Sequence, residues 1–404
     1  MDVSNIAELN TFLVLDAIRS KGEVTRGQLV RELGLSGASV SRIVKRLLAA
    51  GLIDELPGAG TVRGRTPSIL RFVGPPGGVI AVDLGGTLCH GALADLAGVT
   101  VAEDSRPASE GSDAAGALLK CVDALEARAA ELTMPVRAIV VGIPALIDPS
   151  SGLATAGPNL HWQGFDLIGI LRQGLAQPFE VDNDVNLGAL GQAWRGEGRG
   201  VQSFVTLSLG TGVGGAVVID GHLIRGWHNA AGEAGYFPVP SGRRFRGAPG
   251  RLGFEQVASG PALSARAGSL IGRGEPSSLT RSGFGVADIF AAAACGDRVG
   301  GLVVSELITD VATAMAGITA LIDPERIILD GSIGRALRPW LADLRSSVAA
   351  QVFQAPEIVV SKLGPDATVL GAIARALALV AELDSPAHLP RRAPRQRGGN
   401  PPAT

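Results

Sequence analysis

The sequence predicts an α/β protein with two lobes, preceded by a winged helix-turn-helix domain. Residues 1–72 have the pattern of three helices followed by two short strands. Residues 73–382 alternate strands, glycine-rich turns and helices, which is typical of α/β folds. Within this second region, Gly-Thr turns occur at Thr87 and again at Thr211, which suggests that the fold is duplicated.

The composition limits the kinds of function. At 404 residues, the chain can form two or three domains with apolar cores of their own. The formal net charge is −2, so any surface for nucleic acid must be local. Residues 1–72 hold more Lys and Arg than Asp and Glu, which fits an N-terminal DNA-binding domain without demonstrating one.

The location of the protein is predicted from signals and cysteines. The N-terminus lacks the charged and apolar segments of a secretory signal, and the apolar runs at 136–147 and 373–381 are too short to span a bilayer. Cys89, Cys121 and Cys295 lack metal-ligand spacing, which predicts buried thiols in a reducing compartment. We therefore expect a cytoplasmic protein with no membrane partner.

The first three helices are predicted from apolar spacing and capping residues. Residues 7–20 place apolar side chains near one helical face. Thr25 is a suitable N-cap for a second helix, which Gly34 ends. Ser36 can cap a third helix, whose apolar side chains form an inward stripe at helical spacing. The stripe consists of Val40, Ile43, Val44, Leu47 and Leu48.

The opposite face of the third helix indicates DNA binding. Its small hydroxyls allow close approach to a groove, and the cations behind them can contact phosphates. Two strands, 52–56 and 67–72, flank an arginine-bearing tip, as in a wing. The alternative is a solvated basic face on a domain that binds protein. DNA contact is predicted for Thr25, Arg26, Ser36, Ser39, Ser41, Arg42, Lys45, Arg63 and Arg65.

The segment LSLGTGVGGAVVIDG contains G-x-G-x-x-G at Gly210, Gly212 and Gly215. In a dinucleotide-binding fold, such glycines lead from a strand into a helix whose N-terminus binds pyrophosphate. Here a second apolar strand follows, and the Asp-Gly pair after it is a hairpin signal. The dinucleotide interpretation therefore fails, although backbone N–H groups of such a hairpin can still bind phosphate.

A similar turn lies upstream in the segment DLGGT. Gly85 and Gly86 permit a positive φ in a tight turn between strands. Asp83 offers a carboxylate for a metal-bound water, and Thr87 offers a hydroxyl for phosphate. Between the two turns, VDNDVNLGALGQAW ends a strand and opens a helix. A carboxylate at that point can take a proton from a sugar hydroxyl.

Residues 75–380 resemble the ROK family (repressor, open reading frame, kinase). The resemblance rests on DLGGT, NDVNLGALGQ, LGTGVGGAVVIDGHLIRGWHNAAGEAGYFPV and FEQVASGPA, which match in order and spacing. It implies the actin-like, hexokinase-like two-lobed ATPase fold. With the N-terminal domain, the whole chain resembles the family's transcription-repressor branch.

The resemblance also implies roles for matching residues. Asp184 lies where the kinases have their general base, and the sugar-contacting positions are Asn183, Asp184, Glu233, Tyr236 and Glu255. The phosphate motifs are Asp83, Gly85, Gly86 and Thr87, and then Gly210, Thr211 and Gly212. Each assignment has a structural alternative, in which the glycines serve only the hairpins and Asp184 caps its helix.

Two departures from the family pattern bear on cofactors. Zinc-bearing members have His where this chain has Tyr236, followed by three cysteines, whereas RRFRGAPGRLGFE contains none. Zinc is therefore predicted to be absent. Kinases usually carry a run of glycines where this chain has IILDGSIG, and Asp330 and Ser332 weaken the case for MgATP.

The sequence is compatible with two functions. One is a sugar-responsive transcriptional repressor of carbohydrate metabolism genes, which requires no cofactor. It would bind operator DNA as a homodimer or higher homo-oligomer, with a small sugar or sugar derivative as effector. The other is an ATP-dependent sugar kinase, or a bifunctional regulator-kinase, with Asp184 as catalytic base. The N-terminal domain favours the repressor, because a free-standing kinase has no need of it.

The predicted domains follow from these assignments. Residues 1–72 form the winged helix-turn-helix domain. Residues 73–184 with 366–382 form the first lobe, and residues 185–365 form the second. Residues 383–404 are rich in Pro, Arg and Gly and are predicted to be a disordered tail.

Overall fold

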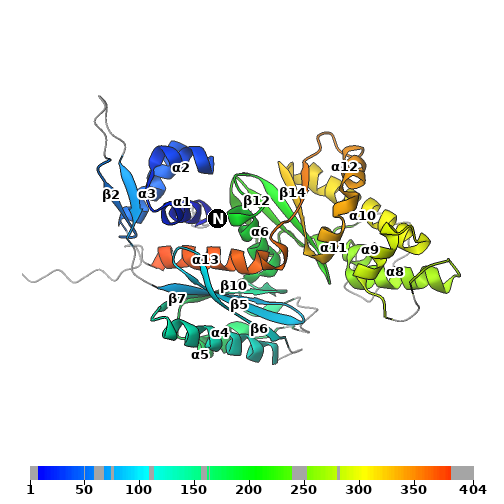
Figure 1. Ribbon diagram of the computed structural model, residues 1–404, viewed down its shortest axis with the longest axis horizontal. Helices are drawn as coiled ribbons and strands as arrows, with labels where there is room; N and C mark the ends of the chain where they lie inside the picture. The colour runs from blue at the N-terminus through cyan, green and yellow to red at the C-terminus, as the bar shows by residue number, and fades with distance from the viewer. Residues whose placement is uncertain are drawn as a thin grey trace, which may run out of the picture.

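The computed structural model describes residues 8–49, 51–58, 68–73, 77–108, 113–155, 162, 164–238, 253–279 and 283–383. These residues form a small N-terminal domain and two α/β lobes (Figure 1). The predicted fold class is thereby confirmed. Arg63 and Arg65 at the predicted wing tip, and the predicted tail after Leu383, lie outside the described residues.

The N-terminal domain is a winged helix. Its elements are α1 (Glu8–Lys21), β1 (Val24–Thr25), α2 (Arg26–Leu33), α3 (Gly37–Ala49), β2 (Ile53–Leu56) and β3 (Ile69–Phe72). Thr25 caps α2 in a capping box with Gln28, and Gly34 ends that helix at φ 65°. Ser36 Oγ accepts a hydrogen bond from Ser39 N at 3.1 Å. The predicted caps are therefore confirmed, and the strands form the antiparallel sheet β1-β3-β2.

The first lobe is built on a five-stranded sheet of order β10-β7-β4-β5-β6. Its strands are β4 (Gly78–Leu84), β5 (Leu88–Asp95), β6 (Thr100–Pro107), β7 (Val136–Ile143) and β10 (Phe179–Asn183), and a short ladder joins β8 (Leu146–Ile147) to β9 (Ala154–Thr155). Helices α4 (Asp113–Glu131) and α5 (Leu167–Gly174) pack on one face, while α13 (Ala367–Leu383) packs on the other. Helix α6 (Asp184–Arg195) lies between α13 and the sheet of the second lobe, in a core that both lobes share. Neighbouring residues such as Ile80 and Ala81 enter opposite cores, as strand geometry requires.

The second lobe has a sheet of order β13-β12-β11-β14-β15. Its strands are β11 (Phe204–Leu209), β12 (Val213–Ile219), β13 (His222–Ile224), β14 (Arg326–Asp330) and β15 (Glu357–Val360). Its helices are α7 (Glu255–Ala258), α8 (Gly260–Gly272), α9 (Val286–Ala294), α10 (Arg298–Ile322), α11 (Gly331–Ala336) and α12 (Leu341–Ala349), with 3-10 turns η2 (Ala234–Tyr236), η3 (Arg338–Trp340) and η4 (Gly364–Asp366).

Among the described helices, α10 alone is long and apolar enough to cross a membrane by length and composition. However, 56% of its apolar window is buried within the protein. Residues such as Val311 and Met315 pack into the core of the second lobe. This burial is typical of the central helix of a folded domain.

The two sheets share one topology, which supports the predicted duplication. In each sheet, three antiparallel strands are followed by two parallel ones, and a Gly-Thr turn joins the first two strands. Asp220 and Gly221 have φ of 51° and 74°, so both take the positive values that a two-residue hairpin of this kind requires. The G-x-G-x-x-G segment is therefore a hairpin, as predicted.

Two expectations from the sequence are wrong. Cys89 and Cys121 are buried, but Cys295 is exposed, because it follows the last turn of α9 at the surface. Neither Gly85 nor Gly86 has a positive φ. Gly85 instead allows close backbone approach, since a Cβ there would lie 3.1 Å from the carbonyl oxygen of Leu88.

Candidate functional site

Four carboxylates from both lobes come together between the two Gly-Thr turns. Asp83 lies near the end of β4 and Asp184 opens α6, while Glu233 precedes η2 and Glu255 opens α7. Their charges act on one another in sequence: Asp184 raises the pKa of Asp83, Glu233 raises that of Asp184, and Glu255 raises that of Glu233. The fold therefore joins four of the predicted site residues into one acidic cluster.

Burial dominates the electrostatics of this cluster. Loss of solvent raises the pKa of Asp184 to about 7, despite a hydrogen bond from Val185 N to its carboxylate at 2.8 Å. Burial, with repulsion from Asp184, raises the pKa of Asp83 to about 8. The pKa of Glu233 is also raised, first by burial and then by Glu255. The pKa of Asp184 thus lies near neutral pH, in the range that is typical of groups that exchange protons at functional sites.

At the start of α6, Asn183 and Asp184 have different structural roles. Asn183 is the N-cap, and its side-chain oxygen accepts hydrogen bonds from Val185 N at 2.9 Å and Asn186 N at 3.3 Å. Asp184 is the first helical residue rather than the cap. The capping alternative thus applies to Asn183, whose oxygen is already engaged, and not to Asp184.

The second Gly-Thr turn lies directly against the cluster. Glu255 accepts a hydrogen bond from Val213 N at 3.1 Å, and a Cβ on Gly212 would lie 3.0 Å from its carboxylate oxygen. Gly210 N closes the turn by donating to the carbonyl of Gly212 at 2.9 Å. Thr211 is exposed at the tip, as is Thr87 in the first turn. Two exposed hydroxyls therefore flank the acidic cluster, one from each repeat.

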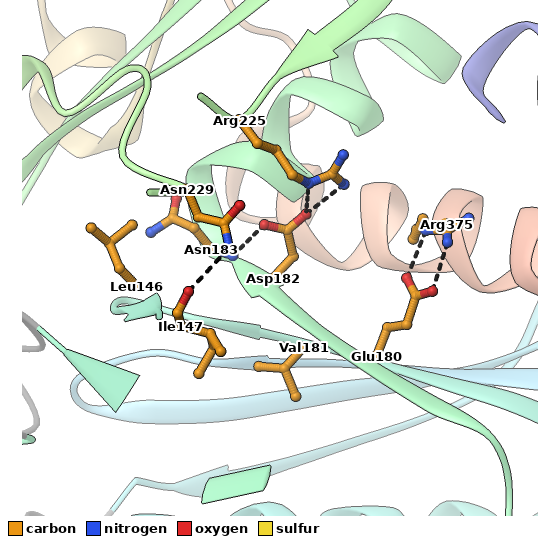
Figure 2. A pocket seen from close by; sticks show the side chains of 9 residues that line it. All are labelled: Leu146, Ile147, Glu180, Val181, Asp182, Asn183, Arg225, Asn229 and Arg375. Atoms are coloured by element: carbon orange, nitrogen blue, oxygen red, sulfur yellow. Dashed lines mark hydrogen bonds and ion pairs between the residues drawn. The ribbon is translucent and has the colours of Figure 1, made fainter. Parts of the chain in front are cut away.

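A pocket of about 230 Å³ opens beside Asn183 (Figure 2). It lies between β8 and β10 of the first lobe and the loop after β13 of the second. Arg225 donates to Asp182 at 2.8 Å, and Asn229 donates to the carbonyl of Ile147 at 3.1 Å, so both contacts cross between the lobes. The pocket is lined by Leu146, Ile147, Glu180, Val181, Asp182, Asn183, Arg225, Asn229 and Arg375.

Charges in the pocket are paired. Arg375 binds Glu180 in a two-point contact, at 2.6 Å and 2.7 Å, and also binds Glu382 at 2.8 Å. Asp182 accepts from Arg225 and, at 3.0 Å, from Asn186. Apart from Asn183, none of these lining residues was predicted from the sequence. The sequence feature that indicates them is the alternation of polar residues along β10, which lies at a sheet edge.

Residues 79–379 match the model of the ROK family, which covers most of the chain. The chain belongs to the ROK family. Residues 8–63 match the MarR family. The two matches cover the body and the winged helix, and they confirm the resemblance inferred from the motifs.

Individual relatives include both regulators and kinases. The chain is 28% identical to the xylose repressor of Caldicellulosiruptor bescii, over 91% of this chain and 95% of the repressor. It is 30% identical to the glucokinase of Halalkalibacterium halodurans, over 72% of this chain and 92% of the kinase. A solved ROK family transcriptional regulator, a homologue of the E. coli MLC protein, superimposes with a TM-score of 0.75 at 27% identity, over 94% of this chain and 98% of that chain. The two regulators thus match nearly the whole of this ROK protein.

The glycine run of the family's kinases is replaced here by a fixed carboxylate. Asp330 caps α11 by accepting from Gly331 N at 2.7 Å, and it also accepts from Gln192 at 3.2 Å and Arg335 at 3.0 Å. Gly331 has φ 77°, and a Cβ there would lie 2.2 Å from the carbonyl of Leu209. The glycine is therefore needed for the turn, and the carboxylate of Asp330 is held in place by three hydrogen-bond donors.

Tyr236, at the position of the zinc-binding His, is 57% exposed. It ends the 3-10 turn η2 that follows Glu233, and its exposure argues against a role as a core aromatic. The segment after it, where the family has its cysteines, lies outside the described residues. Within the part of the chain that the structure describes, no three His, Cys, Asp or Glu side chains are placed to hold a metal ion.

The predicted DNA-binding residues divide into two groups. Ser41, Arg42 and Lys45 are exposed on α3. By contrast, Arg26 pairs with Glu55 at 2.8 Å and Ser68 at 3.1 Å, so a phosphate would have to compete with these partners. The hydroxyls of Thr25, Ser36 and Ser39 are engaged in capping. The face that is free to read DNA is therefore the middle of α3.

Proposed function

We propose that this protein is a sugar-responsive DNA-binding transcriptional regulator, acting as a repressor of carbohydrate metabolism genes. The observation that carries the proposal is the junction of a winged helix, with Arg42 and Lys45 exposed on α3, to a ROK body with a half-buried acidic cluster. Cations on α3 supply phosphate contacts, and Ser41 supplies a small polar contact to base edges. The full-length match to regulators supports the same function.

The effector site comprises the acidic cluster and the pocket beside Asn183. Carboxylates accept hydrogen bonds from several hydroxyls at once, which suits a polyhydroxylated ligand. The pocket volume of about 230 Å³ falls below the roughly 300–1,000 Å³ of drug-sized sites, which favours a small molecule. Trp227 lies in the sequence between the lining residues Arg225 and Asn229. It is 89% exposed and offers an indole face on which a sugar ring can stack.

The regulator acts in the cytoplasm as a dimer or higher oligomer. A symmetric dimer presents two recognition helices to half-sites separated by one helical turn of DNA or a multiple of it. Sugar binding changes the relation between the lobes and thereby the spacing of these helices. A coupling of about 1–3 kcal/mol, or a 5–150-fold change in operator affinity, is typical of such linkage.

A sugar kinase is the second candidate, because the pKa of Asp184 near 7 suits a general base at neutral pH. When bound, MgATP would supply the phosphoryl group, and the exposed Thr87 and Thr211 would contact its phosphates. The buried carboxylate of Asp330, at the end of β14 in the second lobe, fits a nucleotide poorly because the phosphates of a nucleotide are also negatively charged. This mismatch favours the regulator.

Selection of DNA from a random library, followed by anisotropy titration with and without sugar, tests the proposal. D-xylose, D-glucose and N-acetyl-D-mannosamine are the probes, each screened first by thermal shift. We expect one enriched sequence, one or more stabilising sugars, and a sugar-dependent change in affinity. Failure to enrich any sequence would contradict DNA recognition. ATP-dependent sugar phosphorylation at about 1–100 s⁻¹, abolished in Asp184→Asn, would favour the kinase.

A further inference from the structure

The winged helix contacts both lobes of the body. Helix α1 packs against α13, which covers the first sheet (Figure 1). It also packs against β13 at the edge of the second sheet. Leu13 of α1 packs on the apolar core that α6 and α13 share. On the other side, Asn10 lies against Gly221, where a Cβ would be 3.2 Å from the Asn10 oxygen. Any rotation of one lobe relative to the other therefore alters the surface on which α1 rests.

A polar contact joins α1 to the end of α6. The carboxylate of Asp16 accepts a hydrogen bond from the indole of Trp194, and it faces the positive charges of Arg195 and Arg19. Trp194 is 3% exposed. Arg195 in turn donates to the carbonyl of Gly98 at 2.8 Å, in the first lobe. Asp16 is half-buried and Trp194 is buried, so the contact is partly shielded from solvent and links α1 to the last turn of α6.

Helix α6 connects this contact to the acidic cluster. Its 12 residues run from Asp184 to Arg195, a span of about 18 Å at the usual helical rise. The helix is held tightly along its length, since a Cβ on Gly191 would lie 2.2 Å from the carbonyl of Ala367 in α13, and one on Gly371 would lie 1.6 Å from that of Leu187. These backbones are in direct contact, so α6 and α13 move together.

We propose that α6 transmits effector binding from Asp184 at its first turn, through Trp194 at its last turn, to Asp16 of the winged helix. Helix α6 packs between α13 and strands β11 and β12 of the second lobe, so a shift of α6 with α13 relative to the first sheet then tilts α1. The recognition helix follows, because Val14 and Ile18 of α1 share one core with Val40 and Val44 of α3. Asp16 is thus a positioning residue, which touches neither sugar nor DNA. The inference rests on the proposed function and specifies how its two sites communicate.

The test measures operator affinity by anisotropy with and without the stabilising sugar, from D-xylose, D-glucose and N-acetyl-D-mannosamine, on the full chain. Wild type should show a change within the usual 5–150-fold range. Asp16→Ala, which removes the acceptor, should reduce that change to less than about twofold, well below that range. Asp16→Asn, which keeps an acceptor, should retain it. Glu23→Gln, a carboxylate-to-amide change at an exposed site of the same domain, is the matched control.

Asp16→Ala should still bind sugar, which an unchanged sugar-induced thermal shift would show. A body that is merely destabilised would lose both the thermal shift and the sugar-dependent change in operator affinity. Should Asp16→Ala fail to fold, Trp194→Phe removes the donor instead while keeping an aromatic ring. A full sugar-dependent change in the folded variant overturns the inference and leaves the proposed function intact. If wild type binds operator but no tested sugar alters its affinity, both the sugar response and the coupling are overturned.

Discussion

Asp83 and Asp184, which come from a strand end and a helix start 101 positions apart in the chain, are close enough for the charge of one to raise the pKa of the other. Both are half-buried, and loss of solvent is the larger cause in each case. Such a pair is costly to ionise, because low polarity and like charge act in the same direction. Groups of this kind are typical of sites that bind or exchange protons.

Stability should therefore fall as pH rises toward 8. The pKa of Asp184 is about 7 in the folded state against 3.8 for the ordinary group, so the folded chain binds more protons between these values. A raised folded pKa gives stability that is present at low pH and lost as pH rises through the folded pKa. Asp184→Asn, which stays neutral, should melt close to wild type at pH 5 and at least several degrees higher at pH 8.5. A melting difference that does not vary with pH would contradict the assignment.

The sequence predicted the elements that depend on local signals. The cap at Thr25, the helix end at Gly34 and the hairpin at Asp220 all formed as predicted, because each is determined by a few neighbouring residues. The choice between Asn183 and Asp184 as cap could not be made in advance. Both residue types cap helices well, and the backbone path out of β10 decides between them.

Contacts between distant segments were missed. Arg26 was predicted to bind DNA, but it lies beside Glu55, 29 residues away. Asp182 pairs with Arg225, 43 residues away, across the lobes. No periodic pattern indicates which charged side chains the fold brings together. Motif resemblance placed the acidic cluster, whereas the paired charges of the pocket required the structure.

The Arg225–Asp182 pair should fix the position of the two lobes relative to each other. Arg225→Met leaves the partly buried carboxylate of Asp182 without its strongest donor, which typically costs about 1–3 kcal/mol. The melting temperature should fall, and sugar affinity should change with it, because the pocket lies between the same segments. The double variant Arg225→Met/Asp182→Asn also removes the unpaired carboxylate charge, so it should recover part of the lost melting temperature. Equal melting temperatures of Arg225→Met and wild type would show that the pair does not contribute to stability.

The DNA face can be separated from the wing by salt dependence. Arg42→Ala should alter sequence preference if Arg42 reads base edges. Arg63→Ala, at the predicted wing tip outside the described residues, should weaken binding to all sequences and flatten the salt slope by about one unit. Anisotropy titrations at several salt concentrations measure both effects. An unchanged slope for Arg63→Ala would exclude a phosphate contact by the wing.

The metal content is predicted from the replacement of His by Tyr236 and from the lack of cysteines in the segment 243–255 that follows it. Without thiolates, the usual structural zinc site of the family cannot form. Purified protein should therefore contain no stoichiometric zinc by elemental analysis, and chelators should leave its melting temperature unchanged. One zinc per chain would contradict this prediction. A melting temperature that falls with chelator and recovers with added zinc would do the same.

The contact between α6 and α13 provides the most direct test of their joint movement. A Cβ at Gly371 would overlap the carbonyl of Leu187, so Gly371→Ala must force the helices apart. Such overpacking typically costs about 1–3 kcal/mol, occasionally more. Gly188→Ala is the matched control, since its Cβ would meet nothing nearer than Thr368 Oγ1 at 3.9 Å. Alanine is favoured over glycine in a helix by up to about 1 kcal/mol, so this control should melt at or above wild type. Similar melting of the two variants would show that the helices can separate freely, and a rigid link through α6 would then be untenable.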